Sequence, residues 1–182
     1  MQTYEEKKFN IGELKGISAK TIEEHLKLYA GYVKNTNDLL ASGPYDRRFP
    51  FEYNGMRNHE VYFDSLSDGA KEINPESEFS KRLVETFGSV ETFILDFKTL
   101  SFTRGVGWAV LWFDKKDNRL IISWVDEQHL GQLNNCEMIL GLDMWEHSYV
   151  ADYQPSGKKQ YVEDFFTNLN WSKIEENYNK AQ

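Results

Sequence analysis

Three of the four histidines of this sequence, together with one aspartate, are spaced so that they could bind a metal ion. His25 and His59 fall in two segments of helical periodicity, and Asp143 and His147 bracket the end of an apolar run. Three imidazoles and one carboxylate with an open position suit iron or manganese, and also zinc. A single histidine of an amphipathic helix is more often a structural or surface residue, so the pattern alone is only suggestive of a metal site.

The N-terminal elements that would position this set can be predicted from hydrophobic spacing. Apolar residues recur at helical intervals over 18–41 and again from about 54 to 66, with a proline-containing loop over 43–53 between them. Two antiparallel helices joined by a short loop could bring His25 and His59 face to face.

After a polar connector, the hydrophobic period changes from helical to strand-like. The expected fold class is α+β, with an N-terminal long α-hairpin and a C-terminal three-stranded antiparallel sheet surrounded by helices. The expected domains are 1–72 and 73–182, with the metal site at their interface. The C-terminal elements expected in order are helices 77–87 and 89–103, strands 107–113, 120–125 and 138–142, a short helix within 145–153, and helices 161–169 and 172–181.

Composition excludes several classes of protein. The 182 residues carry a net charge of −8, which argues against a general nucleic-acid binder. Aromatic residues make up 15% of the chain, unlike a disordered chain, and the single cysteine, Cys136, rules out a disulfide framework. No apolar run approaches the ~20 residues of a membrane span, and the first residues do not resemble a secretory signal. We therefore expect a cytoplasmic protein with no membrane partner.

Several short motifs resemble those of one enzyme family. The segment 141–149, GLDMWEHSY, resembles the D-x-W-E-H-A-Y signature of iron/manganese superoxide dismutases. Four further segments resemble motifs of this family in the family's order, and together the matches cover about residues 18–180: 32–37 (YVKNTN), 58–63 (NHEVYF), 104–111 (RGVGWAVL) and 161–171 (YVEDFFTNLNW).

The resemblance implies a function and a ligand set. His25, His59, Asp143 and His147 match the family's four metal ligands, and a solvent molecule would complete the coordination. The implied cofactor is one iron or manganese ion per chain, and the implied reaction converts superoxide to O2 and H2O2 while the ion alternates between two oxidation states. The alternative is a protein of this fold that binds metal but has altered or no catalysis. A zinc hydrolase is disfavoured because the chain has no H-E-x-x-H motif.

The resemblance also assigns residues around the metal. Tyr32 matches the tyrosine that guards the substrate channel, and Trp108 and Trp145 match the aromatic walls. His129 is expected to be the residue that hydrogen-bonds the metal-bound solvent, as in members with histidine rather than glutamine there. Gln128 takes this position if the register shifts by one.

A homodimer is implied, with a tetramer as the alternative assembly. Glu146 matches the residue that reaches across the dimer to the partner's ligand histidine. Tyr29 stands near the family's second channel histidine, and Val150 stands where the family has that histidine's tyrosine partner from the other subunit. We expect Tyr29 to fill the histidine's space at the dimer interface.

The first helix departs from the family pattern. His25 and Tyr32 are seven residues apart, whereas the family's ligand histidine and tyrosine are eight apart. Seven residues are close to two α-turns, so this helix is expected to lack the extra bulge residue that eight requires. An ungapped alignment would instead make Glu24 the ligand. Gly55, four residues before His59, resembles the manganese type, but the sequence does not fix the metal.

Overall fold

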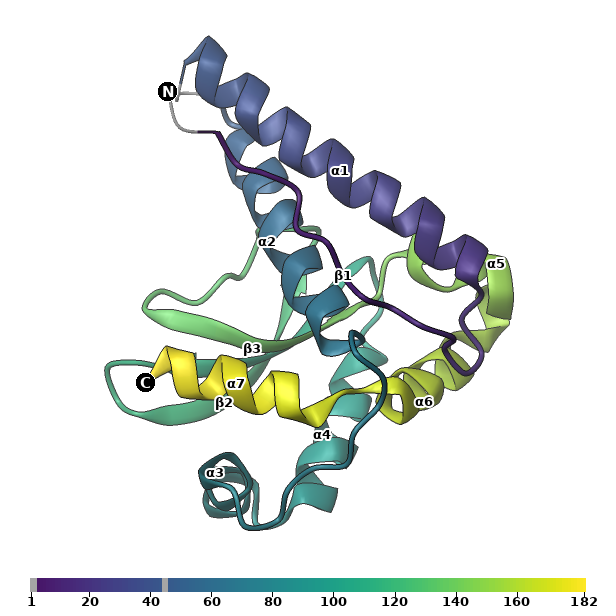
Figure 1. Ribbon diagram of the computed structural model, residues 1–182. Helices are drawn as coiled ribbons and strands as arrows, with labels where there is room; N and C mark the ends of the chain where they lie inside the picture. The colour runs from purple at the N-terminus through teal and green to yellow at the C-terminus, as the bar shows by residue number, and fades with distance from the viewer. Residues whose placement is uncertain (1–2, 44–45) are drawn as a thin grey trace.

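The computed structural model describes residues 3–43 and 46–182. An extended N-terminal arm, residues 3–17, leads into two long helices, α1 (Ala19–Ser42) and α2 (Phe49–Ser65), which pack against each other (Figure 1). The expected α+β class is confirmed. The remaining elements are α3 (Glu78–Phe87), α4 (Val90–Ser101), β1 (Gly107–Asp114), β2 (Arg119–Asp126), β3 (Cys136–Asp143), the 3-10 turn η1 (Glu146–Ser148), α5 (Val150–Tyr153), the 3-10 turn η2 (Pro155–Gly157), α6 (Lys158–Asn168) and α7 (Trp171–Ala181).

Local sequence explains where α1 begins and which way it faces. The Ser18 side chain accepts a hydrogen bond from the Thr21 backbone N–H at 3.1 Å and so caps the free end of the helix. Buried residues then follow at intervals of three or four along one side of α1: Thr21, Ile22, His25, Tyr29, Val33 and Thr36. Residues 19–42 are α-helical throughout, in agreement with the expected absence of a bulge.

Helix α2 begins at Phe49, five residues before the predicted start at Asn54. The predicted start was too late because Pro50 was assigned to the loop. Proline usually ends a helix but is favoured in the first turn, where its missing N–H is not needed. Pro44 and Tyr45 of the predicted loop lie outside the described residues.

The sheet has the strand order β2-β1-β3, with both pairs antiparallel. Helices α2 and α7 pack against β3, whereas α4 packs against β1 and β2. Trp108 of β1 lies opposite Val125 on one side and Asp143 on the other. Asp143, the last residue of β3, therefore lies at the edge of the sheet that faces α1 and α2.

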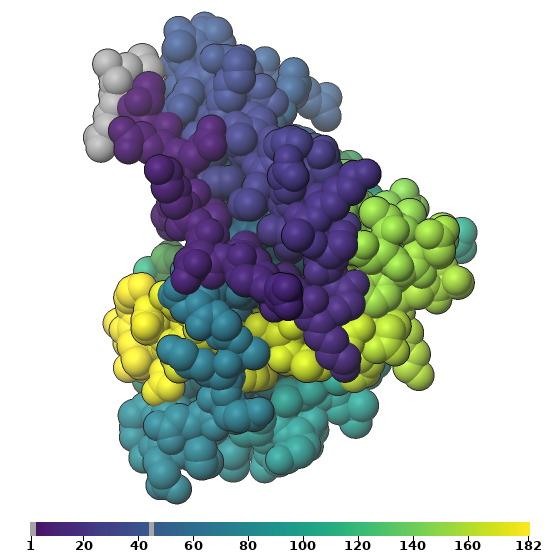
Figure 2. Space-filling view, turned by 45° about the vertical axis from the view of Figure 1, so that its right-hand side comes forward, coloured from purple at the N-terminus to yellow at the C-terminus, as the bar shows by residue number. Residues whose placement is uncertain are grey.

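Each end of the N-terminal arm is held by a different asparagine, whose side chain makes two hydrogen bonds to the arm's backbone. Asn37 accepts from the Tyr4 N–H at 2.8 Å and donates to the Tyr4 carbonyl at 2.9 Å. Asn168 makes the same pair of bonds to Lys15, at 2.9 Å each. Figure 2 shows the arm in dark purple on the surface beside α1. The arm therefore joins α1 to α6.

Aromatic and aliphatic side chains form a continuous core between the helices and the sheet, with Trp108, Tyr62, Phe63 and Phe165 completely buried. Within residues 3–43 and 46–182, the helices are all too short or too polar to cross a lipid bilayer.

Candidate metal centre

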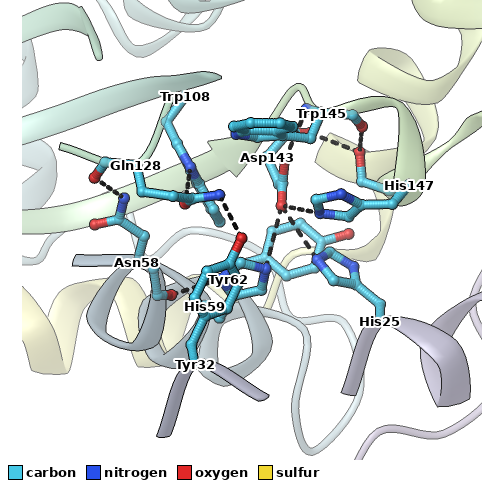
Figure 3. Close-up of polar contacts among 12 residues, drawn as sticks. His25, Tyr32, Asn58, His59, Tyr62, Trp108, Gln128, Asp143, Trp145 and His147 are labelled. Carbon is cyan, nitrogen blue, oxygen red and sulfur yellow. Dashed lines mark hydrogen bonds and ion pairs between the residues drawn. The ribbon is translucent and has the colours of Figure 1, made fainter. Parts of the chain in front are cut away.

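Four side chains from four separate elements meet between α1, α2 and the end of β3 (Figure 3). The Asp143 Oδ2 atom lies at their centre. It is 3.1 Å from His25 Nε2 on α1, 3.1 Å from His147 Nε2 on η1 and 3.5 Å from His59 Nε2 on α2. One ligand atom from each residue lies within 4.8 Å of every other. The structure therefore gathers the four residues that the sequence singled out.

Neighbouring groups hold Asp143 in this position. Its Oδ1 accepts a hydrogen bond from the Trp145 backbone N–H at 2.8 Å. Its carbonyl oxygen accepts from the Tyr161 hydroxyl and the Ser148 hydroxyl, both at 3.0 Å. These contacts turn Oδ2 toward the histidines and leave it available to bind a metal ion.

His59 is oriented in the same way by its backbone. Its Nδ1 donates to the Gly55 carbonyl oxygen at 2.6 Å, one turn back along α2. This bond fixes the tautomer, so Nε2 carries a lone pair. Nε2 is completely buried and has no hydrogen-bond partner among the described residues. A buried polar atom without a partner is costly, and a metal ion would satisfy it.

Electrostatics favour neutral imidazoles at His25 and His59 and a charged carboxylate at Asp143. Burial lowers the pKa of His59 to about 3 and also lowers the pKa of His25. Burial alone would raise the pKa of Asp143, but His147 and His25 hold it well below its usual range. His147 is less enclosed, and the Asp143 carboxylate raises its pKa despite a burial penalty. Neutral imidazole nitrogen and carboxylate oxygen are the forms that bind metal.

The donor set fits a single metal ion. Metal–ligand bonds of about 2.1 Å would let one ion reach ligand atoms that lie within 4.8 Å of one another after small side-chain movements. Glu24, the rival ligand of the ungapped alignment, lies outside the cluster with its exposed carboxylate on Lys27 Nζ at 2.9 Å. His25 therefore holds the α1 position.

A second layer of polar residues adjoins the cluster, and here the structure differs from the expectation for His129. Gln128 is completely buried and donates from Nε2 to the Tyr32 hydroxyl oxygen at 3.0 Å. Its Oε1 accepts from Trp108 Nε1 at 2.8 Å. The Gln128 side chain therefore occupies the place expected for His129, which corresponds to the alternative register.

The His129 ring instead packs edge-on against Phe51, with ring centroids 5.8 Å apart. The cause is the backbone at Glu127, which adopts a positive φ of 51° immediately after β2. This turn rotates the next residue, Gln128, toward the cluster and directs His129 to the side.

Aromatic rings enclose the ligands. The Trp108 ring meets His59 edge-on at 5.1 Å, and Trp145 stacks on His147 at 5.9 Å. His25 and His59 are fully buried, whereas the His147 side chain remains 24% exposed. The cluster is therefore most open on the His147 side, where Glu146 also faces solvent.

Tyr29 is buried within the single chain, and its expected place at a dimer interface stays a prediction. It is only 1% exposed beneath the N-terminal arm. Its hydroxyl accepts from the Lys7 backbone N–H at 2.9 Å and donates to Glu60 Oε1 at 3.3 Å. Tyr29 lies on the same side of α1 as His25, but its hydroxyl is bonded to the arm and to Glu60 and, within the residues described, makes no hydrogen bond to the four ligand candidates.

Two contacts to this site were missed by sequence reasoning. Asn58 anchors the loop that carries Gln128, and Tyr161 supports Asp143. Asn58 precedes a ligand candidate and Tyr161 begins a recognised motif, so both lay within the informative segments. Their partners, however, are backbone oxygens, which leave no pattern in a sequence.

Comparison with known proteins was made by family and by individual relatives. The model of the C-terminal domain of iron/manganese superoxide dismutases matches residues 75–177. The chain is 32% identical to an iron superoxide dismutase of Cupriavidus metallidurans, with 88% of each chain covered. It is 29% identical to an iron superoxide dismutase of Aquifex aeolicus, covering 92% of this chain and 87% of the relative. It is also 29% identical to a manganese superoxide dismutase of Mycobacterium leprae, covering 86% and 82%.

These matches span both the helical and the sheet regions of the chain, including the segments that carry His25, His59, Asp143 and His147. This chain belongs to the iron/manganese superoxide dismutase family.

Proposed function

We propose that this protein is a superoxide dismutase that binds one iron or manganese ion through His25, His59, Asp143 and His147. The observation that carries the proposal is the buried His59 Nε2, which lacks a partner among the described residues and faces Asp143. Such an ion would supply alternation between two oxidation states one electron apart, so that one superoxide is oxidised to O2 and a second is reduced to H2O2.

Formation of H2O2 consumes two protons, and in this proposal Tyr32 donates one of them. Burial raises the pKa of the Tyr32 hydroxyl well above its usual range, with Asp143 adding to the effect. Tyr32 therefore keeps its proton at neutral pH. Because its Oη already accepts from Gln128 Nε2, its own proton is free to be donated to a group in the cavity.

The contribution of Gln128 depends on the fixed orientation of its side-chain amide. Trp108 Nε1 can only donate, so its bond to Gln128 assigns Oε1 to the Trp108 side and Nε2 to the Tyr32 side. The amide is held at both ends and cannot rotate without losing a buried hydrogen bond. A fixed donor beside a metal site tunes the proton affinity and potential of that site. In this proposal Gln128 fills the role first expected for His129.

The surrounding rings restrict access. With His25, His59 and Asp143 fully buried, a ligand as small as superoxide would enter beside the partly exposed His147. Trp145 and Phe51, whose ring centroids are 6.5 Å apart, flank this side.

The assembly and cellular setting belong to the same proposal. The exposed Glu146 would reach the ligand histidine of a second copy in a homodimer, with a tetramer as the larger alternative. Residues 1–72 and 73–182 would act as two domains that share the metal site, and the working compartment would be the cytoplasm.

The test is metal analysis of the purified protein together with superoxide turnover after separate loading with iron and manganese. About one ion per chain with turnover in at least one form is the expected result, and the ratio of the two activities gives the metal preference. One bound ion without turnover in either form would favour the alternative, a metal-binding protein of this fold without dismutase activity. Absence of bound metal would overturn the ligand assignment.

A further inference from the structure

The loop that carries Gln128 is not part of the regular sheet. Strand β2 ends at Asp126, and the turn that follows is closed by two backbone hydrogen bonds between Asp126 and Leu130, at 2.8 and 3.1 Å. The Gln128 side chain is fixed by Tyr32 and Trp108, but its backbone projects from this turn. Its position therefore depends on what holds the Gln128 peptide.

Two amide side chains hold the Gln128 carbonyl oxygen. Asn58 Nδ2 donates to it at 3.0 Å, and Gln132 Nε2 donates to it at 3.2 Å. Gln132 Nε2 also donates to Asn58 Oδ1 at 3.3 Å. The two hydrogens of the Gln132 amide thus reach two acceptors, and the three residues form a closed set of bonds.

This set joins the loop to the helix that carries a ligand candidate. Asn58 is 2% exposed and directly precedes His59 on α2. The same stretch of α2 therefore fixes both His59 and, through Asn58 and Gln132, the backbone of Gln128. Gln132 touches neither Tyr32 nor any of the four ligand candidates through a hydrogen bond in the described part of the chain.

We propose that Gln132 is a positioning residue that, together with Asn58, sets the distance of the Gln128 amide from Tyr32 and the metal site. This role rests on the function proposed above, because Gln128 is taken to serve that site. Gln132 acts through Gln128 and takes no part in the chemistry.

The test variant is Gln132→Met, which keeps the length of the side chain and removes its donor. The readout is hydrogen exchange of the Trp108 indole N–H in the full-length chain, followed by NMR, because this proton is bonded to Gln128 Oε1. We expect exchange about fivefold to tenfold faster than in the parent protein, the effect of weakening about one hydrogen bond. The Trp112 indole N–H, bonded to Ser123 Oγ at 2.8 Å, is the internal reference and should not change.

Two further variants keep the result interpretable. Gln132→Lys restores a donor able to reach both oxygens and should return Trp108 exchange to near the parent rate. Asn134→Met changes an exposed amide of the same loop and should have no effect. Unchanged Trp108 exchange in Gln132→Met, equal acceleration at Trp108 and Trp112, or failure of Gln132→Lys to restore the rate would each overturn the proposal.

Turnover gives a separate measurement. In the iron- or manganese-loaded Gln132→Met protein, superoxide turnover should fall by less than about tenfold, since the effect passes through Gln128. If the parent protein shows no turnover at all, the proposed function fails while the exchange experiment still decides the role of Gln132.

Discussion

Two adjacent residues of α2, His59 and Glu60, enter two different polar clusters, each built around a buried carboxylate. In the metal centre, Asp143 is surrounded by three imidazoles. In the second cluster, Glu60 is 6% exposed and contacts Lys7 Nζ at 3.1 Å, Arg57 at 2.8 Å and the Tyr29 hydroxyl at 3.3 Å.

The clusters differ in what they leave unsatisfied. Both oxygens of Glu60 have cationic or hydroxyl partners, and burial raises the pKa of Tyr29 to about 12, so that its proton stays in place. The metal centre instead leaves His59 Nε2 and His25 Nδ1 without partners in the described residues. A satisfied buried cluster fastens the arm to the helices, whereas an unsatisfied one is prepared for a ligand.

The largest expected difference between the two clusters is in metal binding. Asp143→Asn removes the charge that all three imidazoles face, so metal affinity should fall by more than about 100-fold. Metal analysis after dialysis against a defined iron or manganese concentration measures it. Glu60→Gln on the neighbouring residue is the matched control and should keep about one ion per chain. Equal metal loss in both variants would mean that the clusters are not separate.

Acid should destabilise the metal-free protein through the centre. His25 and His59 have lowered folded pKa values, so the unfolded chain takes up protons near pH 6.5 while the folded chain does not. Stability is therefore lost as pH falls below about 6.5, and His59 alone accounts for about 2 kcal/mol between pH 7 and pH 5. His147, whose pKa is raised, contributes stability below about pH 6.5 that is lost at higher pH. Urea unfolding at pH 7 and pH 5 measures the loss, and His59→Leu should show less of it.

Packing gives a sharper contrast between crowded and open helix positions. A Cβ added at Gly55 would lie 2.5 Å from the Tyr32 ring, whereas one added at Gly31 would meet nothing within 4 Å. Gly55→Ala should cost about 1 to 2 kcal/mol of unfolding free energy and displace Tyr32. Gly31 lies inside α1, where alanine is a better helix former than glycine and meets no neighbour. Gly31→Ala should therefore stabilise the protein by about 0.5 to 1 kcal/mol. Similar thermal shifts in the two variants would contradict the contrast.

The smallest loss of stability is expected at the Glu60 cluster. Lys7 is 59% exposed and Arg57 is 39% exposed, so water can replace their lost partner. Glu60→Gln should therefore destabilise by only about 1 kcal/mol. Urea unfolding of the metal-free protein measures this. A loss of several kcal/mol would show that the cluster carries much more of the fold than its exposure indicates.

Periodicity was sufficient for most of the helices and strands, because these depend on local patterns. Spacing suggested the four ligand candidates, and the resemblance to a known family was needed to select them. Three features were not accessible in this way. The start of α2 at Phe49 could not be predicted because Pro50 is as compatible with a loop as with the first turn of a helix. The choice between Gln128 and His129 depends on one backbone angle at Glu127. The burial of Tyr29 depends on the arm, whose own residues show no periodicity because its partners are distant in sequence.

The arm has a consequence for the order of events during synthesis. Lys15 is held by Asn168, so this early segment cannot seat until α6 has left the ribosome. Asp143 and His147 also emerge long after His25 and His59. A nascent chain therefore exposes the two imidazoles of His25 and His59 before the other two ligand candidates have been synthesised. Selection of the metal is thereby deferred until β3, η1 and α6 have been synthesised, when Asn168 can hold the arm in place.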